Sequence, residues 1–273
     1  MSEILKAVLF GIVEGITEWL PISSTGHLIL LEEFMQLNMS PSFVNMFLVV
    51  IQLGAIMAVV LLYFNKIWPF GAGMRLLPDK KVLWYKIFAA CMPAAIIGLL
   101  FNDYIEALFF NHWTVAIMLI LFGIGFIGIE NHNKKVSPRV NSLEEITYKD
   151  AFWIGMFQVV AAVFPGTSRS GSTILGGMVM GLRREVAAEF TFFLAVPVMF
   201  GASALKIAKH GLDFTSEELA VMGVGLISSF LVSIIAIKFL MTYIKKHDFK
   251  VFGWYRIVLG IVIILYFTMW NQV

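Results

Sequence analysis

Residues 11–27, GIVEGITEWLPISSTGH, decide the fold, because they begin as a membrane helix and then depart from one. The apolar run carries two glutamates, Glu14 and Glu18, and ends at Pro21 before it reaches the roughly 20 residues that cross a bilayer. A turn of serine, threonine and glycine follows, and then a second short apolar piece, residues 26–36. This order is typical of a re-entrant hairpin, which is stable at membrane depth only where it is buried in protein or lines a cavity.

The composition is that of an integral membrane protein. Of the 273 residues, 59% are hydrophobic and 14% are charged, whereas about a quarter of the residues in a soluble domain are charged. Six further apolar segments have about the length of a bilayer span: residues 43–64, 84–101, 112–130, 186–206, 217–242 and 251–270. A cleaved signal peptide over residues 1–25 is the alternative for the N-terminus. Glu14 and Glu18 would then fall within or just after its apolar core, and no small-x-small cleavage site follows cleanly.

A second stretch, residues 155–169 (GMFQVVAAVFPGTSR), aligns with residues 11–25 at a constant offset. The aligned pairs are Gly11 and Gly155, Glu14 and Gln158, Pro21 and Pro165, Ser23 and Thr167, and Ser24 and Ser168. Three expected spans separate the stretches, so the second repeat would enter from the opposite face. We therefore predict one all-α polytopic membrane domain over residues 1–273, with about six transmembrane helices plus two re-entrant helical hairpins. The inverted repeats would cover approximately 1–130 and 150–273 and share a site near the midplane.

Lysine and arginine residues separate onto two sides of this topology. One side holds Lys66, Arg75, Lys80, Lys81, Lys86, Lys134, Lys135, Arg139, Lys149, Arg183, Arg184, Lys245, Lys246 and Lys250. The other side holds only Lys6, Lys206 and Lys209. Because positive charge is retained in cytoplasmic loops, we expect both termini outside and a site that opens to the extracytoplasmic side.

Glu14 and Glu18 are spaced i, i+4 and would share one helix face. A lone charge at membrane depth costs about 2.5–3.5 kcal/mol on insertion scales, and two like charges cost more unless a cation lies between them or one is protonated. Carboxylate oxygens suit Mg²⁺ or Ca²⁺, so the pair is a candidate divalent metal site. The alternative is a pair of interfacial glutamates with their charged ends in water.

Ser23, Ser24 and Thr25 lie where the second half-helix should begin, so capping is their simplest role. The same helix N-terminus offers free N–H groups to an anion. His27 follows Ser24 by one turn, which predicts a nucleophile and a base for phosphoryl or acyl transfer. A Ser-x-x-His pair is a weak signal alone, and the two nearby glutamates strengthen it.

Arg169 is the only arginine that this topology places at mid-membrane, in the second turn, PGTSRSGST. An arginine among hydroxyls and helix N–H groups is a cradle for phosphate oxygens; the alternative is that Arg169 neutralises a buried glutamate across the repeat axis. Gln52, in the middle of a span, would hydrogen-bond either turn as a supporting residue. The candidate substrate-binding groups are Ser23, Thr25, Gln52, Thr167, Ser168, Ser170 and Thr173.

EGITEWLPISSTGH and PGTSRSGSTI resemble the two signature motifs of the undecaprenyl-pyrophosphate phosphatase family, the BacA type named for bacitracin resistance. The resemblance covers essentially the whole chain, including VVIQLGAIMAVV and EFTFFLAVPVMFGAS. It implies removal of the terminal phosphate from C55-isoprenyl pyrophosphate, which recycles the lipid carrier of peptidoglycan synthesis in the bacterial plasma membrane. The implied site groups are Glu14, Glu18, Ser24, His27, Ser168, Arg169 and Thr173.

The expected enzyme binds a polyprenyl diphosphate and membrane lipids, and no nucleic acid; a homodimer is an open expectation. Ser24 activated by His27 or Glu18 is the preferred attacking group, and a water activated by the same residues is the alternative. The other interpretation of the whole chain is a polyprenyl-phosphate flippase or transporter, because inverted repeats with broken helices are common in secondary transporters. The grouping of acids, imidazole and arginine favours the enzyme.

Overall fold

Six helical stretches are long and apolar enough to cross a membrane, as judged from length and composition. The computed structural model describes residues 1–270. Its candidate spans are Pro41–Leu62, Pro78–Phe101, His112–Asn133, Arg184–His210, Ser216–Tyr243 and Lys250–Met269. These confirm the six spans expected from the apolar segments, so the chain is a multi-pass membrane protein.

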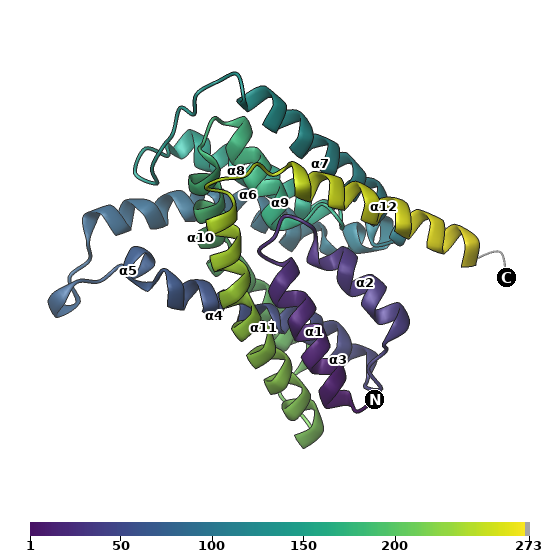
Figure 1. The fold of residues 1–273 in the computed structure, drawn as a ribbon. Helices are drawn as coiled ribbons and strands as arrows, with labels where there is room; N and C mark the ends of the chain where they lie inside the picture. Colours follow the sequence, from purple (N-terminus) through teal and green to yellow (C-terminus); the bar gives the residue numbers. More distant parts are fainter. Residues whose placement is uncertain (271–273) are drawn as a thin grey trace.

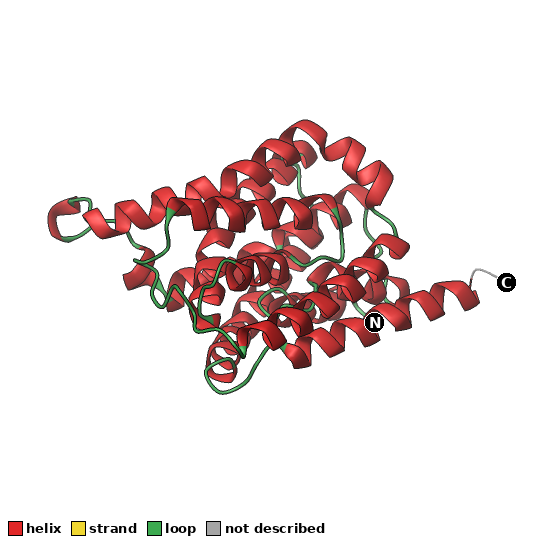
Figure 2. Cartoon of the chain, turned by 90° about the horizontal axis from the view of Figure 1, so that it is seen from above, coloured by secondary structure: helices red, strands yellow, loops and turns green. Residues whose placement is uncertain are grey.

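The helices follow one another along the chain, and the connection between α7 and α8 is a long loop (Figure 1). Their bounds are α1 Glu3–Thr17, α2 Ser24–Phe34, α3 Pro41–Val50, α4 Gln52–Leu62, α5 Phe64–Ile67, the 3₁₀ turn Ala72–Met74, α6 Pro78–Phe109, α7 His112–Asn133, α8 Tyr148–Val163, α9 Arg169–Val179, α10 Arg184–His210, α11 Ser216–Tyr243 and α12 Lys250–Trp270. Figure 2 shows helices and loops without strands over residues 1–270, which confirms the all-α class. The first span consists of α3 and α4, which meet at Ile51.

Two pairs of short helices, α1–α2 and α8–α9, surround the two polar turns. The second helix of each pair is capped by a serine at positive φ, Ser23 (φ 75°) and Ser168 (φ 70°). The hydroxyls accept hydrogen bonds from the N–H groups of Gly26 and Gly171. The caps therefore pair Ser23 with Ser168, whereas the sequence alignment paired Ser24 with Ser168, and that pairing is wrong.

Between its proline and its cap the second turn has two residues, Gly166 and Thr167, where the first turn has only Ile22, and this difference accounts for the shift of register. Gly166 has φ 88°, and a Cβ at this position would lie 2.5 Å from the carbonyl oxygen of Val115. Glycine alone is comfortable with both the left-handed backbone and the close approach. After the shift, Ser24 and Arg169 occupy equivalent first positions of α2 and α9.

Long helices hold the short ones in place from both sides. Helix α11 runs beside α1, and α12 runs beside α7 (Figure 1). Both pairs approach closely at glycines: a Cβ on Gly11 would lie 2.6 Å from the carbonyl oxygen of Gly225, and one on Gly123 would lie 2.6 Å from that of Gly253. Between them, α9 and the first half of α10 are almost wholly buried. The two turns therefore lie in a tightly packed interior.

A buried carboxylate joins three elements at the end of α7. Glu130 is fully buried, and its oxygens accept from Nε and Nη2 of Arg184 in α10. Its Oε1 also accepts from the backbone N–H of Phe249, just before α12, at 2.9 Å. The position at which α12 begins therefore depends on one carboxylate.

We expect Glu130→Ala to lower the free energy of unfolding by about 3 kcal/mol, because removal of one partner leaves a charge and an N–H group without compensation. Thermal unfolding in detergent, followed by circular dichroism, measures the change. The control is Glu106→Ala, whose partner Lys206 lies 3.6 Å away in an exposed pair and for which we expect less than about 1 kcal/mol. Equal shifts for the two variants would show that Glu130 is not a structural anchor.

Candidate active site

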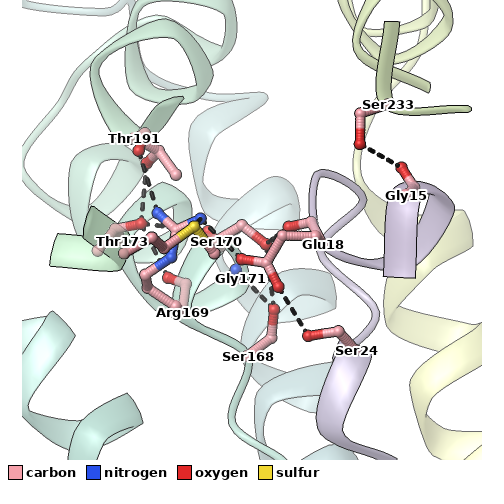
Figure 3. A network of polar contacts seen from close by, with 11 residues as sticks. Gly15, Glu18, Ser24, Ser168, Arg169, Ser170, Gly171, Thr173, Thr191 and Ser233 are labelled. Atoms are coloured by element: carbon pink, nitrogen blue, oxygen red, sulfur yellow. Dashed lines mark hydrogen bonds and ion pairs between the residues drawn. The ribbon is translucent and has the colours of Figure 1, made fainter. Parts of the chain in front are cut away.

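The centre of the site is an ion pair between the two turns. Glu18 caps the end of α1, and Arg169 is the first residue of α9. The Oε1 atom of Glu18 accepts from Nη2 of Arg169 at 2.8 Å, and both side chains are largely buried (Figure 3). In this structure Arg169 neutralises a buried glutamate across the two turns, which was the alternative role considered for it.

Glu18 also binds the hydroxyl of Ser24. The Ser24 Oγ donates to Oε2 of Glu18 at 2.7 Å, so the two carboxylate oxygens face a hydroxyl and a guanidinium (Figure 3). The Ser170 hydroxyl donates to the main-chain oxygen of Glu18 at 2.8 Å. One residue thus connects the first positions of α2 and α9, and the serine has a proton acceptor in place.

Several neighbouring elements hold Arg169 in place. Its Nη1 donates to the main-chain oxygen of Thr191 in α10, and its guanidinium lies 5.9 Å from the ring centroid of Trp19. Thr173 donates to the main-chain oxygen of Arg169 and accepts from the hydroxyl of Thr191, both at 2.9 Å. The buried Nε of Arg169 and the buried hydroxyl of Thr167 have no hydrogen-bond partner among the described residues. They are therefore donors available to a ligand.

Glu14 is the carboxylate without a partner. It is fully buried, and neither oxygen has a hydrogen-bond partner in the described part of the chain. Glu18 and Arg169 are the charged groups that act on it. A buried carboxylate in this state needs either a cation or a proton. The observation fits a divalent metal beside Glu14 and Glu18.

The protein would supply only part of the ligand shell of such a metal. Within residues 1–270 there is no group of three or more His, Cys, Asp or Glu side chains arranged to hold an ion. Mg²⁺ is usually held by one or two carboxylates together with substrate phosphates and water. Two carboxylates therefore suit a metal that arrives with its phosphate ligand.

His27 and Ser24 form hydrogen bonds with other partners and not with each other in the described structure. Its Nδ1 lies 2.7 Å from the main-chain oxygen of Ser23, and its Nε2 lies 2.7 Å from the hydroxyl of Tyr255 in α12. The expected Ser24–His27 pair is therefore not formed, because the imidazole is hydrogen-bonded to Tyr255 in α12 instead. Of the two bases considered for Ser24, the structure places Glu18 in contact.

The contacts of the other candidate residues do not point directly to substrate binding. Ser23 and Ser168 act as caps, and the Ser168 and Ser170 hydroxyls lie 3.2 Å apart. Thr25 and Gln52 form no hydrogen bond to Glu18 or Arg169 in the described structure. Their roles in binding stay predictions.

A second buried arginine joins the two turns. Arg256, in α12, is fully buried and donates only to main-chain oxygens. Its Nη1 binds the carbonyl of Pro21 at 3.1 Å, and its Nη2 binds those of Gly166 and Thr167 at 3.0 and 2.7 Å. The expectation that Arg169 is the only arginine at this depth is therefore wrong, because an apolar span carries a second one.

Comparison with known proteins decides the family. The family model described as bacitracin resistance protein BacA matches residues 7–262. The chain belongs to this family. A Desulfitobacterium hafniense protein named undecaprenyl-diphosphatase is 62% identical over 270 residues, which cover 98% of this chain and 97% of the relative. Clostridium acetobutylicum undecaprenyl-diphosphatase 1 is 62% identical over 269 residues and 98% of both chains, and the undecaprenyl-diphosphatase of Acetivibrio thermocellus is 57% identical with the same coverage.

In this BacA family member, sequence reasoning missed the contributions of α10 and α12. Thr191, Tyr255 and Arg256 all lie inside apolar spans that were judged by their length. Arg256 had a signal, since a charge within a membrane span is expensive and marks a functional position. Thr191 and Tyr255 had none, because threonine and tyrosine are ordinary residues in such spans.

We expect Arg256→Met to destabilise this BacA protein by about 3 kcal/mol or more, since four main-chain carbonyls lose a charged donor. Arg256→Lys should lie between methionine and wild type, because an ammonium keeps the charge but lacks the planar fork. Thermal unfolding in detergent measures both, with the exposed Arg75→Met as control. A lysine variant as stable as wild type would show that the planar guanidinium of Arg256 is not needed to hold the two turns together.

Proposed function

We propose that this protein hydrolyses undecaprenyl diphosphate to undecaprenyl phosphate and inorganic phosphate. The reaction recycles the lipid carrier of peptidoglycan synthesis and confers resistance to bacitracin. Membership of the BacA family and the names of relatives 57–62% identical over nearly the whole chain support it. The observation that supports the chemistry is that the two carboxylate oxygens of Glu18 accept hydrogen bonds from Ser24 and Arg169.

The proposed topology is an inverted repeat with two re-entrant hairpins, α1–α2 and α8–α9. The equivalent serine caps at positive φ and the shortness of these helices support it. Lysine and arginine are concentrated in the loops between α5 and α6, α7 and α8, and α11 and α12. These loops are cytoplasmic in the proposal, both termini are outside, and the site opens to the extracytoplasmic side.

In the proposed reaction, Arg169 and the N-termini of α2 and α9 bind the diphosphate, because free helix N–H groups and a guanidinium fork both suit phosphate oxygens. Thr167 and the Nε of Arg169 supply donors that have no partner in the structure. The Ser24 Oγ attacks the terminal phosphorus, and its proton passes to Oε2 of Glu18. The bond to undecaprenyl phosphate breaks, and water then releases phosphate from the serine.

Glu14 and Glu18 would hold Mg²⁺ or Ca²⁺, with the remaining ligands from the diphosphate and water. The bound ion would neutralise phosphate charge as the transition state forms. The protein contributes the buried position of Glu14, which lacks any other partner. It also holds Glu18 close to Ser24, so that the proton acceptor stays near the hydroxyl.

The test is phosphate release from a C15 or C55 diphosphate by the purified protein in detergent. We expect turnover that stops with a chelator and returns with a divalent metal. A protein that moves the lipid across vesicles but releases no phosphate with any divalent metal would contradict the enzyme and favour the transporter.

We expect Glu14→Gln to raise the Mg²⁺ concentration needed for half-maximal turnover by about tenfold or more, because one of the two carboxylates that would hold the ion becomes a neutral amide. Titration of activity with Mg²⁺ measures the shift. The matched control is Glu106→Gln, in the exposed pair with Lys206. An unchanged metal requirement in Glu14→Gln, or full wild-type turnover in excess chelator, would remove the metal from the proposal.

A further inference from the structure

Both ring nitrogens of His27 have a partner, and the partners determine the tautomer. The main-chain oxygen of Ser23 can only accept, so the Nδ1 that lies 2.7 Å from it carries the proton. In a neutral imidazole the other nitrogen then has a lone pair. The Tyr255 hydroxyl, 2.7 Å from Nε2, is its donor.

Tyr255 comes from an element that is firmly anchored. It precedes Arg256, whose guanidinium is buried between the two turns. Helix α12 packs on α7 with the backbones in contact at Gly123 and Gly253. The tyrosine ring is parallel to the His27 ring within 5°, with centroids 5.6 Å apart. The hydroxyl therefore reaches α2 from a rigid support.

This contact decides which base serves Ser24. His27 and Ser24 are one turn apart on α2, yet Nε2 is engaged by Tyr255 and the Ser24 hydroxyl donates to Glu18. The Tyr255 hydroxyl is the one hydrogen-bond donor to Nε2 among the described residues, so its loss would leave this nitrogen without a partner. One hydrogen bond from α12 thus fixes the direction in which the His27 ring points.

We propose that Tyr255 is a positioning residue: its hydroxyl holds His27 as the Nδ1-protonated tautomer, in one orientation beside the diphosphate site. The proposal rests on the proposed phosphatase function. Tyr255 itself has no hydrogen bond to Ser24, Glu18 or Arg169 within the described residues. It acts on the reaction through His27 alone.

The first test is Tyr255→Phe, which keeps the stacked ring and removes only the hydroxyl. We expect kcat to fall about tenfold, the equivalent of one hydrogen bond, with KM within about twofold of wild type. In a His27→Ala background the same substitution should cause no further loss, because the two residues act as a unit. Tyr148→Phe is the control, since Tyr148 is 50% exposed and Tyr255 is 45% exposed.

The second test reads the tautomer directly and does not depend on activity. In protein with ¹⁵N-labelled histidine, the His27 signals are those that His27→Ala removes. We expect wild type to show an unprotonated Nε2, and Tyr255→Phe to show a mixture of tautomers. An unchanged His27 spectrum in Tyr255→Phe, an unchanged kcat, or a loss that persists in the His27→Ala background overturns the proposal. A wild-type protein without phosphatase activity would contradict the proposed function, while the spectrum would still decide the role of Tyr255.

Discussion

Arg169→Ala should lower kcat/KM for undecaprenyl diphosphate by about 1,000-fold or more. The guanidinium of Arg169 contacts Glu18 across the two turns, and an arginine that stabilises transferring phosphate is worth roughly 10³–10⁵ in rate. It also neutralises Glu18, whose Oε1 lies 2.8 Å from its Nη2. The alanine variant therefore loses phosphate binding and leaves a buried carboxylate without its counter-ion. Phosphate release under single-turnover and steady-state conditions measures the loss.

Arg169→Lys separates charge from geometry at the same position. A lysine keeps the positive charge but lacks the planar guanidinium. Its single ammonium cannot reproduce the separate hydrogen bonds of Nη1 to Thr191 and Nη2 to Glu18 and also bind a phosphate. We expect the lysine variant to recover less than about a tenth of wild-type kcat/KM. The exposed Arg75→Ala should match wild type. Full activity in Arg169→Lys would reduce the role of this residue to that of a simple counter-charge.

Ser24→Ala should lower kcat by about 10⁴-fold or more, because loss of a covalent nucleophile removes the reaction path itself. The structure supports this role through the 2.7 Å hydrogen bond from the Ser24 hydroxyl to Glu18. With substrate labelled in its terminal phosphate, rapidly quenched wild-type protein should carry the label on Ser24. The control is Ser203→Ala, a buried serine whose hydroxyl donates to the main-chain oxygen of Val49.

The size of the Ser24 effect distinguishes the two mechanisms. If water attacks and the serine only orients the phosphate, its removal costs one or two hydrogen bonds, roughly 10–100-fold. Near-normal turnover of Ser24→Ala would exclude the serine nucleophile. Loss of activity without any labelled serine intermediate would favour water activated by Glu18.

Much of this architecture could be predicted from local patterns. The six spans follow from apolar length, and the two polar turns follow from proline, glycine and hydroxyl residues that interrupt it. Glu18, Ser24 and Arg169 were candidates because a polar group inside an apolar segment is costly unless it has a function. The structure brings these three side chains into direct contact.

The alignment of the two turns failed by one residue for a tertiary reason. Direct comparison of the motifs gives no sign that the two caps follow their prolines at different distances, because the backbone of Gly166 is set by its close approach to Val115 in another helix. The cap geometry then pairs Ser23 with Ser168. A cap that lies one residue farther from its proline changes which side chain takes the first position of the helix.

The amino-acid sequence by itself determined the helical class, the number of spans and the polar residues of the two turns, because these depend on hydrophobic length and on neighbours within a few positions. Only the tertiary structure decided that Ser24 has Glu18 and not His27 as its acceptor. It also placed Arg256 between the turns and Tyr255 on His27. The contacts of Arg256 and Tyr255 join residues more than 80 positions apart, and their partners are chosen by helix packing, which local sequence patterns do not encode.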